Sequence, residues 1–261
     1  MMETNNLPYN SDLLKGTGLI QETIQLIDYY EPGISKLDFT TKVLDFNTLG
    51  KAHENRIKDI VHHVFYRRYF TEGEEAVLEL QALRNKYISL EQLSHVLLMF
   101  TAKANPILFD FIVQVFHNER KKGFQKLPPK AAFNFIELAI KEERIKRNWA
   151  KSTKQKVSEH MNACLIDFKL MDRNKQILPQ YIDDFVFNYW LHKLHLSGVA
   201  DNDLMVHPDW QLWGIESQEW LQFVNRLSYK GSLVFQYSGE LIRISWKYKS
   251  MKEFINESIG Q

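Results

Sequence analysis

The sequence has little of the residue types that cross-link or interrupt a chain. Its 261 residues include a single cysteine, Cys164, together with 11 glycines and seven prolines. One thiol cannot close an internal disulfide, and disulfide-free chains are typical of a reducing compartment, so we expect a cytoplasmic protein. Scarce glycine and proline, with 44% hydrophobic residues, favour helices around a sizeable core.

Long apolar runs are also missing. The longest stretches are Val96–Phe100, Ile107–Phe116 and Phe185–Leu191. Each is far shorter than the roughly 20 residues that cross a bilayer. The polar segment Met1–Ser11 lacks the apolar centre of a secretory signal. We therefore expect no membrane span.

Motifs that carry catalysis or hold cofactors are absent as well. Lys15–Gly18 lacks the spacing of a phosphate-binding loop and lies within a helical pattern, and neither a nucleophile elbow nor an HExxH pair occurs. The adjacent His62 and His63 point to different sides of a helix. His192 and His195 have no cysteine or paired carboxylate to complete a metal site. We expect a non-enzymatic protein with no metal, cofactor or small-molecule ligand.

Helical periodicity dominates what is present. Leu13, Thr17, Ile20, Ile24 and Ile27 recur every three or four residues, which predicts a helix over 11–30. The same kind of pattern predicts further helices over 36–45, 52–70, 73–84, 89–102, 105–119, 129–146, 152–169, 179–197 and 216–229.

The clearest β signal lies near the C-terminus. Leu233–Tyr237 and Glu240–Tyr248 alternate in polarity on either side of Ser238-Gly239, a link suited to a tight hairpin. The basic stretch Arg120–Pro129 contains glycine and two prolines, so it is the best candidate for a domain boundary. The predicted fold is mainly α. It has an N-terminal helical bundle over 1–125 and a helical domain over 126–261 with winged-helix-like character and the hairpin.

The net charge of +1 hides an uneven distribution. The window from Arg120 to Lys156 holds twelve basic and three acidic residues, so it carries +9 and the rest of the chain carries −8. A concentrated positive charge fits an anionic polymer such as a nucleic acid. A solvated helix face explains the window equally well.

A winged-helix pattern extends over Arg144–Ile177. Two helices follow each other across a tight junction at Asn148–Ser152, and a short turn or small hairpin comes next. In such modules the second helix enters the major groove by its N-terminal residues. We expect Ser152 to cap that helix, with Gln155 completing a capping box and Ser158 one turn further on. Lysines in a first turn oppose the helix dipole unless a phosphate binds there.

The expected DNA contacts follow from this pattern. They are Arg147, Lys151, Ser152, Thr153, Lys154, Gln155, Lys156, Arg173 and Lys175, with a secondary basic surface of Lys121, Lys122, Lys126 and Lys130. The cations Lys141, Arg144, Lys146 and Arg147 also suit the last turn of the preceding helix, where cations are favourable.

Two other segments have competing interpretations. Residues 216–248 could form a second wing-like module in which Arg243 and Lys247 contact phosphates, although such a hairpin more often caps a helical core. Basic residues beside Tyr66 and Tyr69 could hold RNA, although packing of these tyrosines with solvated arginines is the simpler interpretation. The basic residues concerned are Arg56, Lys58, Arg67 and Arg68.

The sequence resembles the BrxA family, small proteins encoded with BREX (bacteriophage exclusion) systems. The likeness covers about 9–250 and begins at Tyr9-Asn10-Ser11 and Leu19–Thr23. It is strongest at Trp149–Val157 and continues at Leu170 and Ile177–Pro179. The resemblance implies a non-enzymatic phage-defence component with DNA-binding ability and an N-terminal region like the antitermination factor NusB. Some members of the family are labelled inner-membrane proteins, but this sequence has no spanning segment.

Three hypotheses result. The leading one is a component of a BREX complex that binds double-stranded DNA through its phosphate backbone. The second is a scaffold that docks other BREX proteins without touching DNA. The third is RNA binding through the NusB-like bundle.

Overall fold

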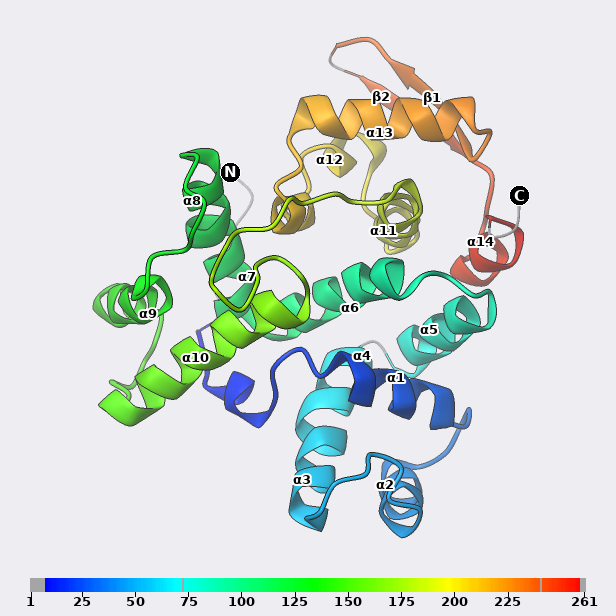
Figure 1. The fold of residues 1–261 in the computed structure, drawn as a ribbon. Coiled ribbons are helices and arrows are strands. Elements are labelled where there is room, and N and C mark those ends of the chain that lie inside the picture. Colours follow the sequence, from blue (N-terminus) through cyan, green and yellow to red (C-terminus); the bar gives the residue numbers. More distant parts are fainter. Residues whose placement is uncertain (1–7, 72, 240, 259–261) are drawn as a thin grey trace. The chain divides into compact units, whose positions relative to one another are not determined.

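The computed structural model describes residues 8–71, 73–239 and 241–258 and divides into two compact units (Figure 1). Unit 1 combines the chain up to Val77 with Leu97–Pro179, and unit 2 combines Leu78–Val96 with the chain from Gln180 onward. The predicted mainly helical fold is confirmed, together with an antiparallel hairpin near the C-terminus. The division into domains 1–125 and 126–261 and the winged-helix-like character stay predictions.

Unit 1 is helical. In chain order its elements are the 3₁₀ turn η1 (Asp12–Lys15), α1 (Ile20–Tyr29), α2 (Lys36–Asp45), α3 (Glu54–Asp59), the π-helical η2 (Ile60–Phe65), α4 (Tyr66–Tyr69), α7 (Pro106–Phe111), the π-helical η3 (Ile112–Phe116), α8 (His117–Lys121), α9 (Ala131–Lys141) and α10 (Lys151–Asp167). Helices α5 (Glu75–Asn85) and α6 (Leu90–Ala104) each begin in one unit and end in the other.

The helix predicted over 11–30 is interrupted, so that prediction is wrong over its first half. Residues Asp12–Lys15 form only a 3₁₀ turn, and α1 does not begin until Ile20. Between them the carbonyls of Gly16 and Gly18 accept hydrogen bonds from Arg68. These tertiary bonds replace the helical ones that local periodicity led us to expect. Of the segment Lys15–Gly18, which was expected within a helix, only Lys15 belongs to the 3₁₀ turn, and Gly16–Gly18 form a loop.

The helix predicted over 129–146 ends early, at Lys141. Glu143 has a φ of +58°, which a continuing helix does not allow. The amide of Arg144 turns back to the carbonyl of Ala139 at 2.9 Å and closes the helix end. Of the basic residues placed in its last turn, Lys141 alone lies there.

Unit 2 surrounds an aromatic core. Its further elements are α11 (Asp184–Leu196), α12 (Asp201–Leu204), the 3₁₀ helix η4 (Pro208–Trp213), α13 (Ser217–Tyr229), β1 (Leu233–Tyr237), β2 (Ile242–Trp246) and α14 (Met251–Ser258). The ring of Phe187 on α11 stacks against Trp210 at 4.6 Å and Phe223 at 4.4 Å. Periodicity did not reveal α12, η4 or α14, because each is too short to show a pattern.

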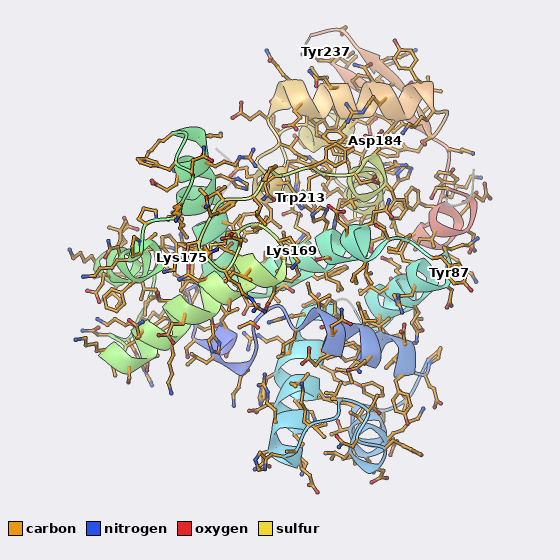
Figure 2. All side chains as sticks on the ribbon, in the orientation of Figure 1. Tyr87, Lys169, Lys175, Asp184, Trp213 and Tyr237 are labelled. Atoms are coloured by element: carbon orange, nitrogen blue, oxygen red, sulfur yellow. The ribbon has the colours of Figure 1, made fainter. Side chains whose placement is uncertain are left out.

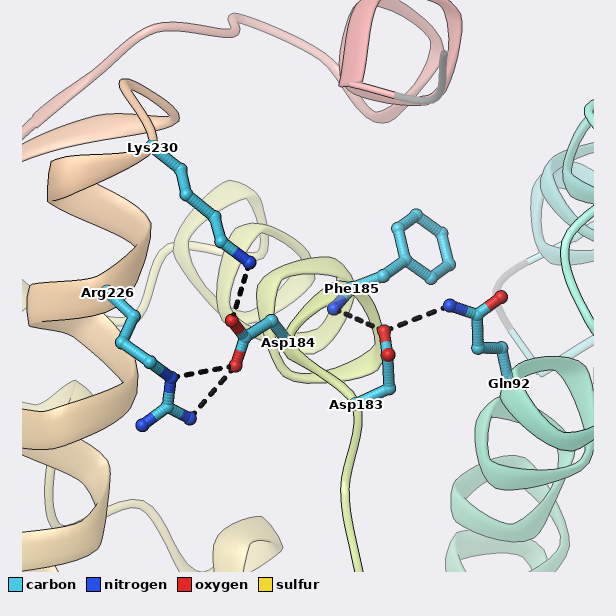
Figure 3. A network of polar contacts seen from close by, with 6 residues as sticks. All are labelled: Gln92, Asp183, Asp184, Phe185, Arg226 and Lys230. Carbon is cyan, nitrogen blue, oxygen red and sulfur yellow. Dashed lines mark hydrogen bonds and ion pairs between the residues drawn. The ribbon is translucent and has the colours of Figure 1, made fainter. Parts of the chain in front are cut away.

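Helix α11 begins at a pair of aspartates, later than the predicted start at residue 179. Asp183 caps the helix through the amide of Phe185 at 2.7 Å and also accepts from Gln92 at 3.0 Å. Asp184 pairs with Arg226 of α13 and with Lys230, the C-cap residue of that helix (Figure 3). Burial raises the pKa of Asp184, but hydrogen bonds from these two cations outweigh it and leave the pKa lower than usual.

The connection between the two strands is longer than predicted. Tyr237 pairs with Ile242, so four residues, 238–241, separate the strands in place of the two-residue link Ser238-Gly239. Glu240, where the second strand was expected to begin, lies outside the described residues. The outer edge of β2 is covered, since Ile242 and Ile244 donate to the side chains of Asn202 and Asp201.

Within the residues that the structure describes, no single helix is long and apolar enough to cross a membrane. One bent pair, Leu90–Ala104 with Pro106–Lys121, meets the requirement jointly, on length and composition alone.

Candidate nucleic-acid interface

Helix α10 carries the strongest part of the predicted DNA site. It starts at Lys151 with Ala150 as its N-cap, and no side chain caps it. The predicted capping box at Ser152 and Gln155 is therefore wrong, because the helix begins two residues earlier than a Ser152 cap requires. The Gln155 amide instead donates to Glu159 at 2.8 Å. The first backbone N–H groups of α10 thus keep no side-chain acceptor.

Most of the predicted contacts around this helix start face solvent. The exposed side chains are Arg147, Lys151, Ser152, Gln155 and Lys156, together with Lys146 in the preceding loop. Thr153 is half-buried, and Ser158 is buried with 6% of its surface exposed. Ser158 therefore cannot reach a ligand from its place on the inner face.

Lys154 differs from its neighbours. Its ammonium group lies 2.6 Å from the carboxylate of Glu137 on α9, and only 14% of its side chain is exposed. This ion pair connects α9 to α10 and neutralises the cation. Among the lysines in the first two turns of α10, Lys151 and Lys156 are the two that extend into solvent.

Arg144 is also engaged within unit 1. Its guanidinium lies 2.8 Å from Asp110 and 4.2 Å from the centre of the Tyr9 ring. The Tyr9 hydroxyl donates to the same carboxylate at 2.6 Å. Burial, followed by this hydrogen bond, raises the pKa of Tyr9. Arg144 thus anchors the loop before α10.

The two remaining predicted contacts lie at the other end of α10. A helix of 17 residues is about 25 Å long, so its N-terminus is that far from the turn that follows its C-terminus. In this turn Met171 bridges to Ile177, in line with the predicted turn or small hairpin. Arg173 is exposed, whereas Lys175 is half-buried with its ammonium group 3.5 Å from the carbonyl of Pro129 (Figure 2).

Part of the secondary basic surface lies beside the turn that follows the C-terminal end of α10. Lys126 bridges to Gln176, and Lys130 is the N-cap residue of α9. Both are exposed, as are Lys121 and Lys122 at the end of α8. Lys122 pairs with Glu119 at 2.9 Å. The structure therefore separates the predicted site into two cationic groups, one at each end of α10.

Buried polar contacts hold α10 in place. Arg68, on α4, is 3% exposed and donates to the carbonyls of Gly16 at 2.8 Å and Gly18 at 3.2 Å. The amide of Gly18 in turn donates to Asp167 in the last turn of α10 at 2.8 Å. The carbonyl of Leu13 in η1 bonds the imidazole of His160, on the same helix, at 2.8 Å. The loop over 16–18 thereby connects α4 to α10.

These contacts correct the expectation that the arginines beside Tyr66 and Tyr69 are solvated. Arg68 is buried, and Tyr69 is buried beside it. Arg67 pairs with Asp12. Sequence reasoning missed Arg68 and Asp167 as structural residues. The close spacing of Gly16 and Gly18 was the signal that something approaches the backbone there.

His192 and His195, for which the sequence offered no further metal ligands, pack against other side chains. His192 is buried, and its Nδ1 donates to the carbonyl of Asn188 at 3.0 Å. The ring of His195 stacks on Trp246 at 3.9 Å. Within the described residues, no group of three or more histidine, cysteine or acidic side chains is arranged to hold a metal ion.

Both cationic groups lie within the part of the sequence that matches a known protein family. The family model BrxA matches residues 7–193, which is more than half of the chain. No curated protein matches the sequence. The matched range includes every residue of the predicted DNA contacts and of the secondary basic surface.

Proposed function

The chain belongs to the BrxA family, whose members are components of BREX phage-defence systems, and we propose that it binds duplex DNA through the N-terminal end of α10. BrxA is not a known family of enzymes. The proposed contact is with the phosphate backbone, so it requires no base-specific readout.

One observation carries the proposal. Residues 144–156 hold six basic residues and no acidic one. Arg144 and Lys154 are engaged in ion pairs, which leaves four exposed cations around an uncapped helix start. These four are Lys146, Arg147, Lys151 and Lys156. Uncapped N–H groups, the positive end of the helix dipole and clustered cations together favour a phosphate.

The lysines of this helix start lie where the helix dipole disfavours cations. The interaction of each lysine with the helix dipole is unfavourable by about a few tenths of a kcal/mol. An acidic partner offsets that cost for Lys154. Lys151 has no carboxylate of its own helix within one turn, since the first acidic residue of α10 is Glu159, two turns away. A bound phosphate would reverse the unfavourable interaction.

The experiment compares a charge-reversed pair with a matched control. We expect Lys151→Glu/Lys156→Glu to weaken binding to a short DNA duplex at least about ten-fold at low salt, because both phosphate contacts become repulsive. Fluorescence anisotropy measures the dissociation constant. The control Lys58→Glu/Lys252→Glu changes the net charge by the same amount at exposed positions of α3 and α14.

Each outcome decides between the hypotheses. Equal losses in the two double variants would show a general charge effect and overturn the assignment to α10. No binding by the unaltered protein, even at low salt, favours the scaffold that docks other BREX proteins. Tighter binding to single-stranded RNA than to duplex DNA favours the third hypothesis.

A further inference from the structure

Unit 2 contains a 3₁₀ helix, a short turn and an α-helix in succession, which is the order of a helix–turn–helix motif, and the sequence did not reveal the first helix. Helix η4 ends at Trp213, and three residues separate it from α13, which starts at Ser217. The first of the three, Gly214, has a φ of +69°, and the second, Ile215, is 7% exposed. A three-residue turn containing glycine is typical of this motif, whose second helix enters the major groove of DNA.

The hairpin runs back along α13. The amide of Ser232 bonds the carbonyl of Leu227 near the end of α13, so β1 leaves from that end. The ring of Phe235 in the middle of β1 lies 6.1 Å from Trp220 in the first turn of α13. The far end of the hairpin therefore lies towards the N-terminal end of α13 (Figure 1). This order, a helix followed by a returning hairpin, resembles a winged helix.

The solvent face of α13 is uncharged along its centre. Gln218, Gln222, Asn225 and Tyr229 are all exposed and follow each other at spacings of four, three and four residues. Residues with these spacings form one stripe on a helix. Glutamine and asparagine amides bind the major-groove edge of adenine with two hydrogen bonds. The opposite face is buried and consists of Trp220, Phe223, Val224 and Leu227.

Cations that are free to contact phosphates lie on the hairpin and just after it. Arg226 in α13 and Lys230 at its C-cap are held by Asp184, and the first turn of α13 contains Glu219 and no lysine. Helix α13 is thus suited to contact bases, and the hairpin is suited to contact phosphates. At α10, by contrast, Lys151 and Lys156 lie on the helix itself. The exposed cations of the hairpin and the residues after it are Arg243, Lys247 and Lys249.

The geometry points to a base-reading contact in unit 2, in which α13 lies in the major groove and the hairpin binds the adjacent backbone. The major groove is about 12 Å wide and accommodates one helix. The inference rests on the proposed function, because it takes duplex DNA as the ligand. It adds a preference for A·T pairs, which a phosphate contact at α10 cannot provide.

The test measures sequence preference separately from affinity. The protein is incubated with a pool of duplexes that share ends and contain a randomised centre, and bound DNA is sequenced. We expect the full chain to enrich a sequence containing A·T pairs. The variant Gln218→Ala/Gln222→Ala/Asn225→Ala should bind that sequence about ten-fold or more weakly and lose the enrichment. Alanine favours an exposed helix, so the fold is retained.

Two further variants separate this inference from the proposed function. Lys151→Glu/Lys156→Glu should bind all duplexes more weakly and keep the preference. Gln211→Ala, which removes an exposed amide outside the stripe, should change neither property. DNA binding without any enrichment would overturn the inference and leave the contact at α10 intact. Enrichment that survives the triple substitution would overturn it too, and absence of all DNA binding would overturn both proposals.

Discussion

His192 is a buried side chain whose charge is controlled by its surroundings. It is completely shielded from solvent, and its ring stacks on Phe254 at 4.6 Å. Burial lowers the pKa of His192 to about 4, despite the opposing hydrogen bond to Asn188. The imidazole is therefore neutral in the folded protein at neutral pH, which fits a place in the aromatic core and accounts for its presence without a ligand.

This pKa predicts how stability changes with pH. An unfolded histidine titrates near 6.5, so the unfolded state binds more protons than the folded state between about pH 6.5 and 4. The free energy of unfolding should fall as pH decreases through this window, by at most about 1.4 kcal/mol per pH unit from this group. Urea denaturation at several pH values checks it. His192→Gln should reduce the slope, and an unchanged slope would contradict the assignment.

The loop between η1 and α1 depends on the absence of two side chains. A Cβ added at Gly18 would lie 2.6 Å from the Cβ of Asp167, which is attached directly to the backbone of α10. A Cβ added at Gly16 would lie 2.5 Å from the Cδ1 of Leu19 and 2.8 Å from the Cγ2 of Val64, which are ends of side chains. A side chain at Gly18 would therefore clash with an atom that cannot move without the backbone, whereas a side chain at Gly16 would meet atoms that can rotate away.

The two glycines make a matched pair of substitutions. Gly18→Ala should lower the free energy of unfolding by about 1–3 kcal/mol, because a backbone-attached atom cannot move aside. Gly16→Ala should cost less, since the ends of Leu19 and Val64 can rotate away. Urea denaturation followed by circular dichroism measures both. A larger cost at Gly16 would contradict this account of how the loop meets α10.

For the whole molecule, the distribution of charge matters more than its sum. A net charge of +1 provides almost no general attraction to DNA. The four exposed cations at the start of α10 would instead release counterions from about four phosphates. The logarithm of the binding constant should then fall with the logarithm of the salt concentration with a slope of about −4 or steeper.

Salt titrations of duplex binding check this prediction. The double variant Lys151→Glu/Lys156→Glu removes two of the four contacts, so its slope should be smaller in magnitude by about two. Lys154→Met/Glu137→Gln removes both partners of an ion pair and leaves the local charge unchanged, so its slope should equal that of the unaltered protein. A slope near −1 (about one phosphate) for the unaltered protein would show that the cations do not act together.

The amino-acid sequence by itself determined the helical fold class, the hairpin near the C-terminus and the inner face of α10. Apolar residues recur at helical spacing along it, and all are buried: Val157, Met161, Cys164, Leu165 and Phe168. The +9 window was also evident from the sequence. These features depend on residues a few positions apart, and periodicity and local charge report on such short distances directly.

Only the tertiary structure decided which polar residues are available. It paired Lys154 with Glu137, buried Arg68 against Gly16 and Gly18, and placed the basic groups at opposite ends of α10. It also interrupted the first predicted helix. The decisive contacts join residues that are distant in the sequence, and the partner that neutralises a charge or bonds a carbonyl is set by packing. No local pattern contains that information.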